Sequence, residues 1–225
     1  MKITYLGHAS LLIETQGKRI VVDPFIKSNP AASSIDIKSL KPDFILITHA
    51  HMDHVADVQE VAVEGTKLIA VFEIATYFGN RGIDAIGMNT GGKAKFDFGT
   101  LKLVTAHHSS VFHDGVQGGN PVGFVLWNEE GCIYIAGDTA LTLDMKLIPQ
   151  MCPPLDLAIL PIGDYFTMGY EDAALAAEFV QCKRVLGYHY DTFPPIKIDH
   201  AKAKAFFQER GLELVLLAIG QSIEV

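Results

Sequence analysis

The sequence predicts a mixed α/β (α+β) fold, arranged as a four-layer αββα sandwich. Residues 1–22 contain three short strand-like runs separated by turns, and from Asp43 onward apolar strand-like runs alternate with helical stretches. Several apolar runs end in metal-ligating residue types, as expected where buried strands end at one edge of a sheet. A chain of 225 residues, with 49% hydrophobic and 20% charged residues, can bury a large core. We therefore expect residues 1–225 to form a single domain.

Strands and helices are expected to alternate along most of the chain. The predicted strands cover residues 2–6, 10–15, 19–22, 44–47, 101–105, 133–136, 157–162 and 184–187. The predicted helices cover residues 55–63, 73–80, 141–149, 171–180 and 201–209. Residues 28–41 and 109–121 are less regular. They are expected to be long loops that either border a pocket or lie on the surface.

A dense group of metal-ligating residue types follows the apolar run 44–47. Residues 48–54 read Thr-His-Ala-His-Met-Asp-His, so three imidazoles and one carboxylate lie within seven residues. These groups are the usual ligands of zinc and related divalent metals. His49, His51 and Asp53 alternate, so they can converge on one point from an extended segment, and His54 can serve a second ion. A solvated surface turn is the alternative, but it rarely carries four such side chains at this spacing.

Three later strands of the predicted set also end in ligand-type residues. The residues that follow them are His107 with His108, then Asp138, then His189. Side chains alternate along a strand, so only one of the adjacent His107 and His108 can face a common site. The sequence therefore predicts a metal site formed by residues far apart in the chain.

The motif and the order of these residues resemble the HxHxDH signature of the metallo-β-lactamase superfamily. The chain most resembles a small group of metal-dependent hydrolases in that superfamily, over nearly its whole length. A more distant likeness is to ascorbate-6-phosphate lactonase and to phospholipase-D-type enzymes. The stretches that carry the resemblance are TYLGHAS at 4–10, DPF at 23–25, HSS at 108–110, GDTA at 137–140, PIGD at 161–164, FTMG at 166–169 and YHYDTFP at 188–194.

The resemblance implies a sandwich of the metallo-β-lactamase type, in which two halves face each other across a binuclear metal site. It also implies two divalent cations, zinc most readily, with manganese, iron or nickel as alternatives. Such a pair lowers the pKa of a bridging water from about 15.7 towards 7 and polarises the substrate. The HSS pattern favours His108 over His107. The implied ligands are His49, His51 and His108 on the first metal, Asp53, His54 and His189 on the second, and Asp138 as the bridge.

Some residues are weaker candidates for a role in the site. Asp53 is expected to orient the hydroxide as well as to ligate a metal, and is therefore a candidate catalytic residue. His8 is a second candidate, as a proton donor or as a partner of a ligand, with a purely structural role as the alternative. Asp23 is similar. Asp164 and Thr167 are expected either to contact substrate or to cap a helix.

Two further expectations concern the surroundings of His189. Asp191 is a candidate acceptor for the second ring proton of a ligating imidazole. Phe193 and the neighbouring tyrosines are expected to pack around His189 rather than to form a binding wall.

The ligand set predicts a hydrolase that acts on a small-molecule ester, lactone or phosphodiester. One alternative is a di-iron redox protein on the same fold, as in flavodiiron oxygen reductases. Those proteins replace the second His of the motif with Glu and carry a flavin domain, whereas this chain is short and has His51. The other alternative is a non-catalytic metal-binding protein, which a complete ligand set does not favour.

Composition limits the partners and the compartment that we expect. A net charge of −8 opposes binding to nucleic acid, which would need a basic face. The three cysteines are isolated, so neither a disulfide framework nor a thiolate zinc site is indicated, and a reducing cytoplasm is expected. No signal peptide or membrane anchor is expected. The expected partner is a small-molecule substrate, and a homo-oligomer is compatible with the sequence.

Overall fold

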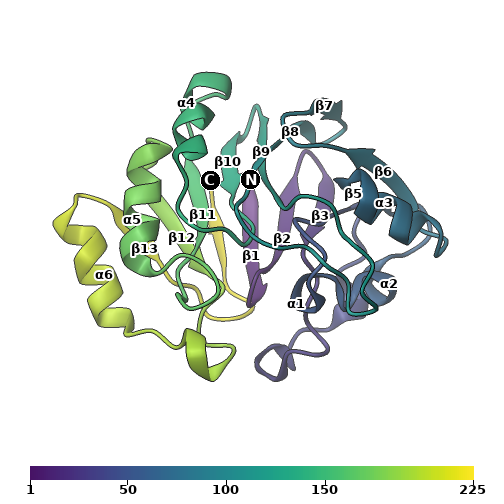
Figure 1. Cartoon of the computed structure of the whole chain (residues 1–225), viewed down its shortest axis with the longest axis horizontal. Coiled ribbons are helices and arrows are strands. Elements are labelled where there is room, and N and C mark those ends of the chain that lie inside the picture. The colour runs from purple at the N-terminus through teal and green to yellow at the C-terminus, as the bar shows by residue number, and fades with distance from the viewer.

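The computed structural model describes residues 1–225 and contains two seven-stranded mixed sheets flanked by helices (Figure 1). In the first sheet β1 to β3 form an antiparallel meander, and β3 to β6 run parallel. The short β14 pairs with β1 at the edge. The order across this sheet is β14 (Ser222–Glu224), β1 (Lys2–Gly7), β2 (Ser10–Thr15), β3 (Lys18–Val22), β4 (Phe44–Leu46), β5 (Lys67–Val71) and β6 (Asp84–Met88).

The second sheet repeats the same progression of strand directions. Strands β7 to β10 are antiparallel, and β10 to β13 are parallel. The two halves are therefore alike in topology although their sequences show no repeat. The order across this sheet is β13 (Glu213–Val215), β12 (Arg184–Tyr188), β11 (Leu157–Pro161), β10 (Gly131–Ile135), β9 (Val122–Asn128), β8 (Gly99–Thr105) and β7 (Lys93–Phe96).

Helices cover the outer sides of the sheets. On one side, α3 (Phe72–Gly79) packs on β5 and β6, near the short α1 (Met52–Val55) and α2 (Val58–Val61). On the other side, α5 (Tyr170–Phe179) packs on β11 and α6 (His200–Glu209) packs on β13, with α4 (Ile148–Met151) above them in Figure 1. The four 3-10 turns are η1 (Pro30–Ala32), η2 (Ile37–Ser39), η3 (Leu143–Leu147) and η4 (Pro194–Ile196).

The largest buried cluster joins the two sheets. It contains Ile13 and Ile45 from the first sheet with Phe124 and Leu186 from the second, and each of these side chains is fully buried. A second cluster lies between the second sheet and its helices, where α5 contributes a face of buried alanines. The αββα sandwich predicted from the sequence is therefore confirmed. None of the helices has the length and apolar character needed to cross a membrane.

Two predicted helices differ from the structure. The predicted helix 55–63 is broken into α1 and α2 at Asp57, whose carboxylate accepts the backbone N–H groups of Ile26 and Lys27 at 2.6 and 2.8 Å. The predicted helix 141–149 is a 3-10 turn followed by the short α4, where Pro149 has no N–H to donate. The other three predicted helices are present within one residue of their expected bounds.

Candidate metal centre

The motif that follows β4 folds back so that its imidazoles meet. His49 and His54 are fully buried, whereas His51 is only partly buried and acts as the N-cap residue of α1. His49 Nε2 lies 3.0 Å from His51 Nδ1. His49 and His51 thus converge as their alternation suggested, whereas Asp53 lies in α1 and groups with His8, His54 and His189.

Asp138, just after β10, lies at the centre of the cluster. Its Oδ2 atom lies 3.0 Å from His189 Nε2, 3.4 Å from His54 Nε2 and 3.6 Å from His108 Nε2. His49 Nε2 is 3.9 Å away. One carboxylate oxygen is thus surrounded by imidazoles that follow strands of both sheets, as a bridging ligand would be.

The structure brings all seven predicted ligands into one cluster. Three overlapping groups have ligand atoms within 4.8 Å of one another. The side chain of Asp53 joins the cluster through Oδ2, which is 3.9 Å from His189 Nε2. The groups are His49 with His51 and His108, His49 with His54 and Asp138, and His8 with Asp53, His54 and His189.

Several buried atoms of the cluster have no hydrogen-bond partner. They include His54 Nε2, Asp138 Oδ1 and both ring nitrogens of His189. The short contact between His189 and Asp138 is therefore not aligned as a hydrogen bond. An unpaired buried polar atom costs about 1–3 kcal/mol, which coordination of a cation would relieve. Imidazole and carboxylate donors without a thiolate suit zinc, manganese and iron, so these residues fit a divalent metal group.

Asp23 and Thr48 orient two of the imidazoles from behind. Asp23 is fully buried, and its Oδ2 accepts hydrogen bonds from Thr48 Oγ1 at 2.6 Å and from His54 Nδ1 at 2.8 Å. Thr48 Oγ1 in turn accepts from His49 Nδ1 at 3.0 Å. These bonds hold a proton on Nδ1 of both His49 and His54, so the Nε2 atoms of both rings face the cluster. Asp23 thus supports two imidazoles of the cluster from behind.

The ring of His8 contacts Asp53 on one side and Thr192 on the other. His8 Nε2 is 3.0 Å from Asp53 Oδ2, and His8 Nδ1 is 2.9 Å from Thr192 Oγ1. Burial, with the nearby His189, lowers the pKa of His8 to about 4, so its imidazole is neutral at pH 7. Its single ring proton then lies on Nε2 and is donated to Asp53, while the Thr192 hydroxyl donates to Nδ1.

Burial and the two carboxylates set the other protonation states. Burial lowers the pKa of His49, His51 and His108, which keeps these imidazoles neutral and able to bind a metal. Burial also acts to lower the pKa of His54, but Asp138 and Asp23 outweigh it and hold that pKa well above the ordinary value. Without a cation, the proton on His54 balances these buried carboxylates. A bound cation would replace it.

A cavity of about 450 Å³ opens onto the cluster. Ser109 borders it, with Oγ 3.3 Å from His51 Nε2. Phe193 also lines the cavity, so the expectation that it only packs around His189 was wrong. Phe193 is the N-cap residue of η4, and Pro195 of that turn lines the cavity beside it. The lining residues are His51, Asp53, His108, Ser109, Asp138, Phe166, His189, Phe193 and Pro195.

Other candidate residues lie outside this cavity. His107 is exposed and bonds to Thr139 only through its backbone, whereas the side chain of His108 joins the cluster. Asp191 pairs with His200 at 2.6 Å instead of with a ligating imidazole. Asp164 and Thr167 neither line the cavity nor cap α5, whose N-cap is Gly169. Their loop instead contributes Phe166, which belongs to the FTMG stretch but was not singled out as a site residue.

The comparisons with known proteins agree with this geometry. Residues 2–189 match the model of the beta-lactamase superfamily domain. The chain belongs to this superfamily. It is 55% identical, over the full length of both chains, to a UPF0173 metal-dependent hydrolase of Flavobacterium johnsoniae. The chain is accordingly a metal-dependent hydrolase, as its ligand pattern predicted.

Two solved structures place the fold more closely. Igni18, a metallo hydrolase from the archaeon Ignicoccus hospitalis, is 33% identical, has a TM-score of 0.89, and is covered over 97% of its chain and 100% of this one. This match confirms the predicted metallo-β-lactamase type of sandwich. CmlA, a diiron beta-hydroxylase from Streptomyces venezuelae, matches over 100% of this chain and 54% of its own, with a TM-score of 0.77. At 13% identity that likeness concerns the fold alone.

Proposed function

We propose that the chain hydrolyses a small-molecule ester, lactone or phosphodiester at a binuclear metal site. The position of Asp138 carries this proposal, because its Oδ2 lies within 4 Å of four imidazoles from both halves. We assign His49, His51 and His108 to one ion and Asp53, His54 and His189 to the other, with Asp138 between them. Zinc is the first choice and manganese the second.

Asp53 and His8 have distinct roles in the proposed hydrolysis. Two bound divalent cations would make water nucleophilic at neutral pH and polarise the scissile carbonyl or phosphoryl oxygen. Asp53 stays ionised, because the His8 bond and the nearby imidazoles hold its pKa below the usual range although burial raises it. Its carboxylate can therefore accept a hydrogen bond from the attacking water. We assign His8 a positioning role, since it holds Asp53 and does not line the cavity.

Two other functions receive less support. CmlA establishes that the fold accommodates di-iron chemistry, but the relatives that match over the whole length are hydrolases by name. A cavity of about 450 Å³ that opens onto the cluster favours an enzyme over a non-catalytic metal-binding protein. The free thiols of Cys132, Cys152 and Cys182 support a reducing, cytoplasmic location as part of this proposal.

An activity assay on stripped and reloaded protein tests the proposal. Metal-free protein, and protein reloaded with zinc or manganese, are offered aryl acetates, simple lactones and bis(4-nitrophenyl) phosphate. We expect hydrolysis of at least one class only after reloading. Asp138→Ala is expected to lower both metal content and activity, the latter by about 100-fold or more, whereas His107→Ala leaves both unchanged. Hydrolysis by none of the reloaded samples, or full retention of metal and activity in Asp138→Ala, would contradict the proposal.

A further inference from the structure

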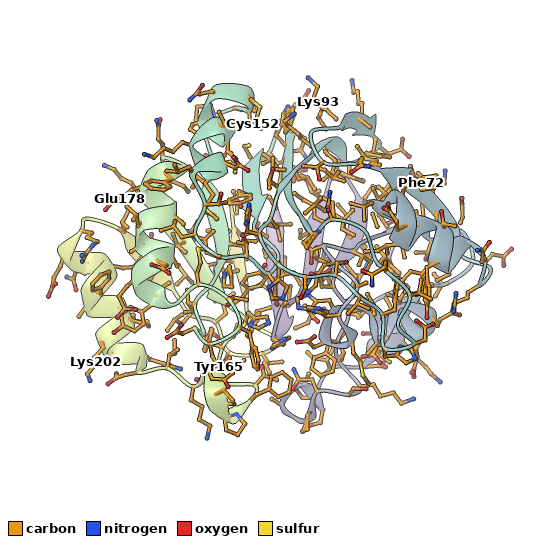
Figure 2. All side chains as sticks on the ribbon, viewed as in Figure 1. Phe72, Lys93, Cys152, Tyr165, Glu178 and Lys202 are labelled. Carbon is orange, nitrogen blue, oxygen red and sulfur yellow. The ribbon has the colours of Figure 1, made fainter.

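One part of the cavity wall is apolar and lies outside the metal cluster. Phe166, Phe193 and Pro195 form this wall, and the ring of Phe166 is 50% exposed. Next to it Tyr165 is even more exposed, with the two rings in edge contact at 4.7 Å. Figure 2 shows Tyr165 at the rim of the molecule. A ligand that covers exposed aromatic rings beside a cavity removes apolar surface from water, and this stabilises the bound ligand.

The loop that carries Phe166 is fixed to the ligand-bearing segments. Its ends pair through the bridge between Gly163 and Gly169, and Met168 N–H donates to the Thr139 carbonyl, next to Asp138, at 3.1 Å. Gly163 packs so closely on the carbonyl of His189 that a Cβ there would lie 2.2 Å from it. The phenyl ring therefore has a defined place relative to the cluster.

Phe193 is held in a similar way. It follows His189 by four residues, and its ring packs edge-on against His8 with the centroids 5.3 Å apart. Phe25 lies next to the same His8 ring and is 6.4 Å from Phe193 between ring centroids. Both rings of the wall are thus positioned by residues that belong to, or directly contact, the proposed metal ligands.

The cavity offers no cation for a charged substituent. Neither Lys nor Arg lines it, and its only charged side chains belong to the metal cluster. Ser109 is the one other polar side chain of the lining. The whole chain carries a net charge of −8, which does not attract anions. A phosphate or carboxylate remote from the scissile bond would therefore lose part of its hydration shell on binding without gaining a charged partner.

We infer that the substrate carries a flat apolar group, and no charged substituent, beside its scissile bond. This inference rests on the proposed hydrolytic function and narrows the group that flanks the scissile bond. With an ester, water adds its oxygen to the acyl carbon while the bond from that carbon to the leaving oxygen breaks, which yields a carboxylic acid and an alcohol. The flat group packs on Phe166 and Phe193. A cavity of about 450 Å³ has room for such a compound, and a remote phosphate is disfavoured.

A matched pair of esters tests this inference on the metal-loaded protein. Phenyl acetate is uncharged, and 4-acetoxybenzenesulfonate adds a remote anion that is a weak metal ligand. We expect KM to be at least about tenfold lower for phenyl acetate. Phe166→Ala removes part of the apolar wall, so it is expected to raise KM for phenyl acetate about tenfold with a smaller change in kcat.

The control is Phe72→Ala, which removes an equally large ring that is 64% exposed on α3, far from Tyr165 in Figure 2. It is expected to leave both kinetic constants unchanged. Binding is read independently by saturation-transfer NMR with phenol, the neutral product. The signal is expected to be strong in the wild type and Phe72→Ala, and weak in Phe166→Ala.

The outcomes separate this inference from the proposed function. Equal KM values for the two esters, or an unchanged KM in Phe166→Ala, would overturn the inference while hydrolysis itself supports the function. If the wild type hydrolyses neither ester, the proposed function fails for esters, and the NMR result decides the inference. Loss of saturation transfer in Phe166→Ala alone then supports it, and equal transfer in all three proteins overturns it.

Discussion

At the scale of single residues, Asp23 orients two of the proposed ligand imidazoles without lining the cavity. It accepts a hydrogen bond from His54 Nδ1 and one from the Thr48 hydroxyl, which in turn accepts from His49 Nδ1. Asp23 adopts a left-handed backbone, with φ of 44°, as do His8 and His189, at 54° and 55°. Such conformations cost free energy in residues other than glycine and persist only where the surroundings hold them. The contacts around Asp23, His8 and His189 therefore hold the backbone that positions the site.

Asp23→Asn tests this control. The amide has one acceptor oxygen, and its NH2 group faces donors, so His54 is expected to lose its fixed tautomer. We expect the affinity for zinc to fall about 10- to 100-fold, measured by competition with a chromogenic chelator. Thr48→Ser keeps the hydroxyl and serves as the control, with affinity close to that of the wild type. Equal affinities in Asp23→Asn and the wild type would remove Asp23 from the ligand support.

The sequence identified the proposed ligands more completely than the residues that contact and orient them. The proposed ligands follow four apolar runs, and four of them lie within the dense motif at residues 48–54. Thr192 and Phe166 have no such pattern, because their contacts depend on how loops far apart in the chain are placed. The predicted role of Asp191, as acceptor for a ligating imidazole, was wrong for the same reason. Asp191 instead pairs with His200 at the start of α6.

At the scale of elements, the loop between β11 and α5 links the cavity wall to the His189 segment. Gly163 allows this link because it has no Cβ, and an added methyl would lie 2.2 Å from His189 O and 3.0 Å from Ile196 Cβ. Backbone on one side and a branched side chain on the other leave little freedom to adjust. The position thus requires glycine for close approach rather than for a special dihedral angle.

Gly163→Ala is expected to shift His189 and to destabilise the fold. Overpacking of this kind typically costs about 1–3 kcal/mol, which chemical denaturation of the metal-free protein would detect. A lower zinc affinity is expected as well, because His189 moves. Gly79→Ala is the control, since a methyl there meets nothing within 4 Å. A Gly163→Ala protein as stable as the control would show that the loop can move freely.

Element boundaries followed the sequence where local signals were strong. The start of α6 is fixed by Asp199, whose carboxylate accepts the N–H groups of Ala201 and Lys202. The break at Asp57 was missed, because its carboxylate bonds to a distant loop and the apolar spacing around it suits a continuous helix. Short edge strands such as β13 and β14 have too little pattern to be found in the sequence.

At the scale of the whole molecule, Glu130 joins the two sheets at their hairpins. Its carboxylate accepts hydrogen bonds from Thr15 Oγ1 at 2.8 Å and from Gln16 N at 3.0 Å, and it lies 3.3 Å from the N-terminal amino group. This contact connects the turn between β2 and β3 to the turn between β9 and β10. Together with the buried cluster shared by the two sheets, it supports our proposal that residues 1–225 form one domain.

Glu130→Gln gives a pH-dependent test of that connection. The Gln16 N–H and the Thr15 hydroxyl lower the pKa of Glu130, so the folded state binds its proton less readily than the unfolded state. Its contribution is therefore present at neutral pH and declines as pH falls through the lowered pKa. We expect Glu130→Gln to reduce the free energy of unfolding by at most about 1 kcal/mol at pH 7, and by less at pH 4. If the difference in free energy of unfolding between the wild type and Glu130→Gln grew on acidification, this prediction would be contradicted.

The binuclear site is the central claim, and metal content per chain tests it most directly. Protein purified without added metal or a metal-binding tag is analysed by inductively coupled plasma mass spectrometry, before and after reloading. We expect about two zinc or manganese ions per chain after reloading, and fewer in Asp138→Ala. A wild-type chain that cannot hold more than one ion would contradict the binuclear claim, and two tightly held irons would favour the di-iron alternative instead.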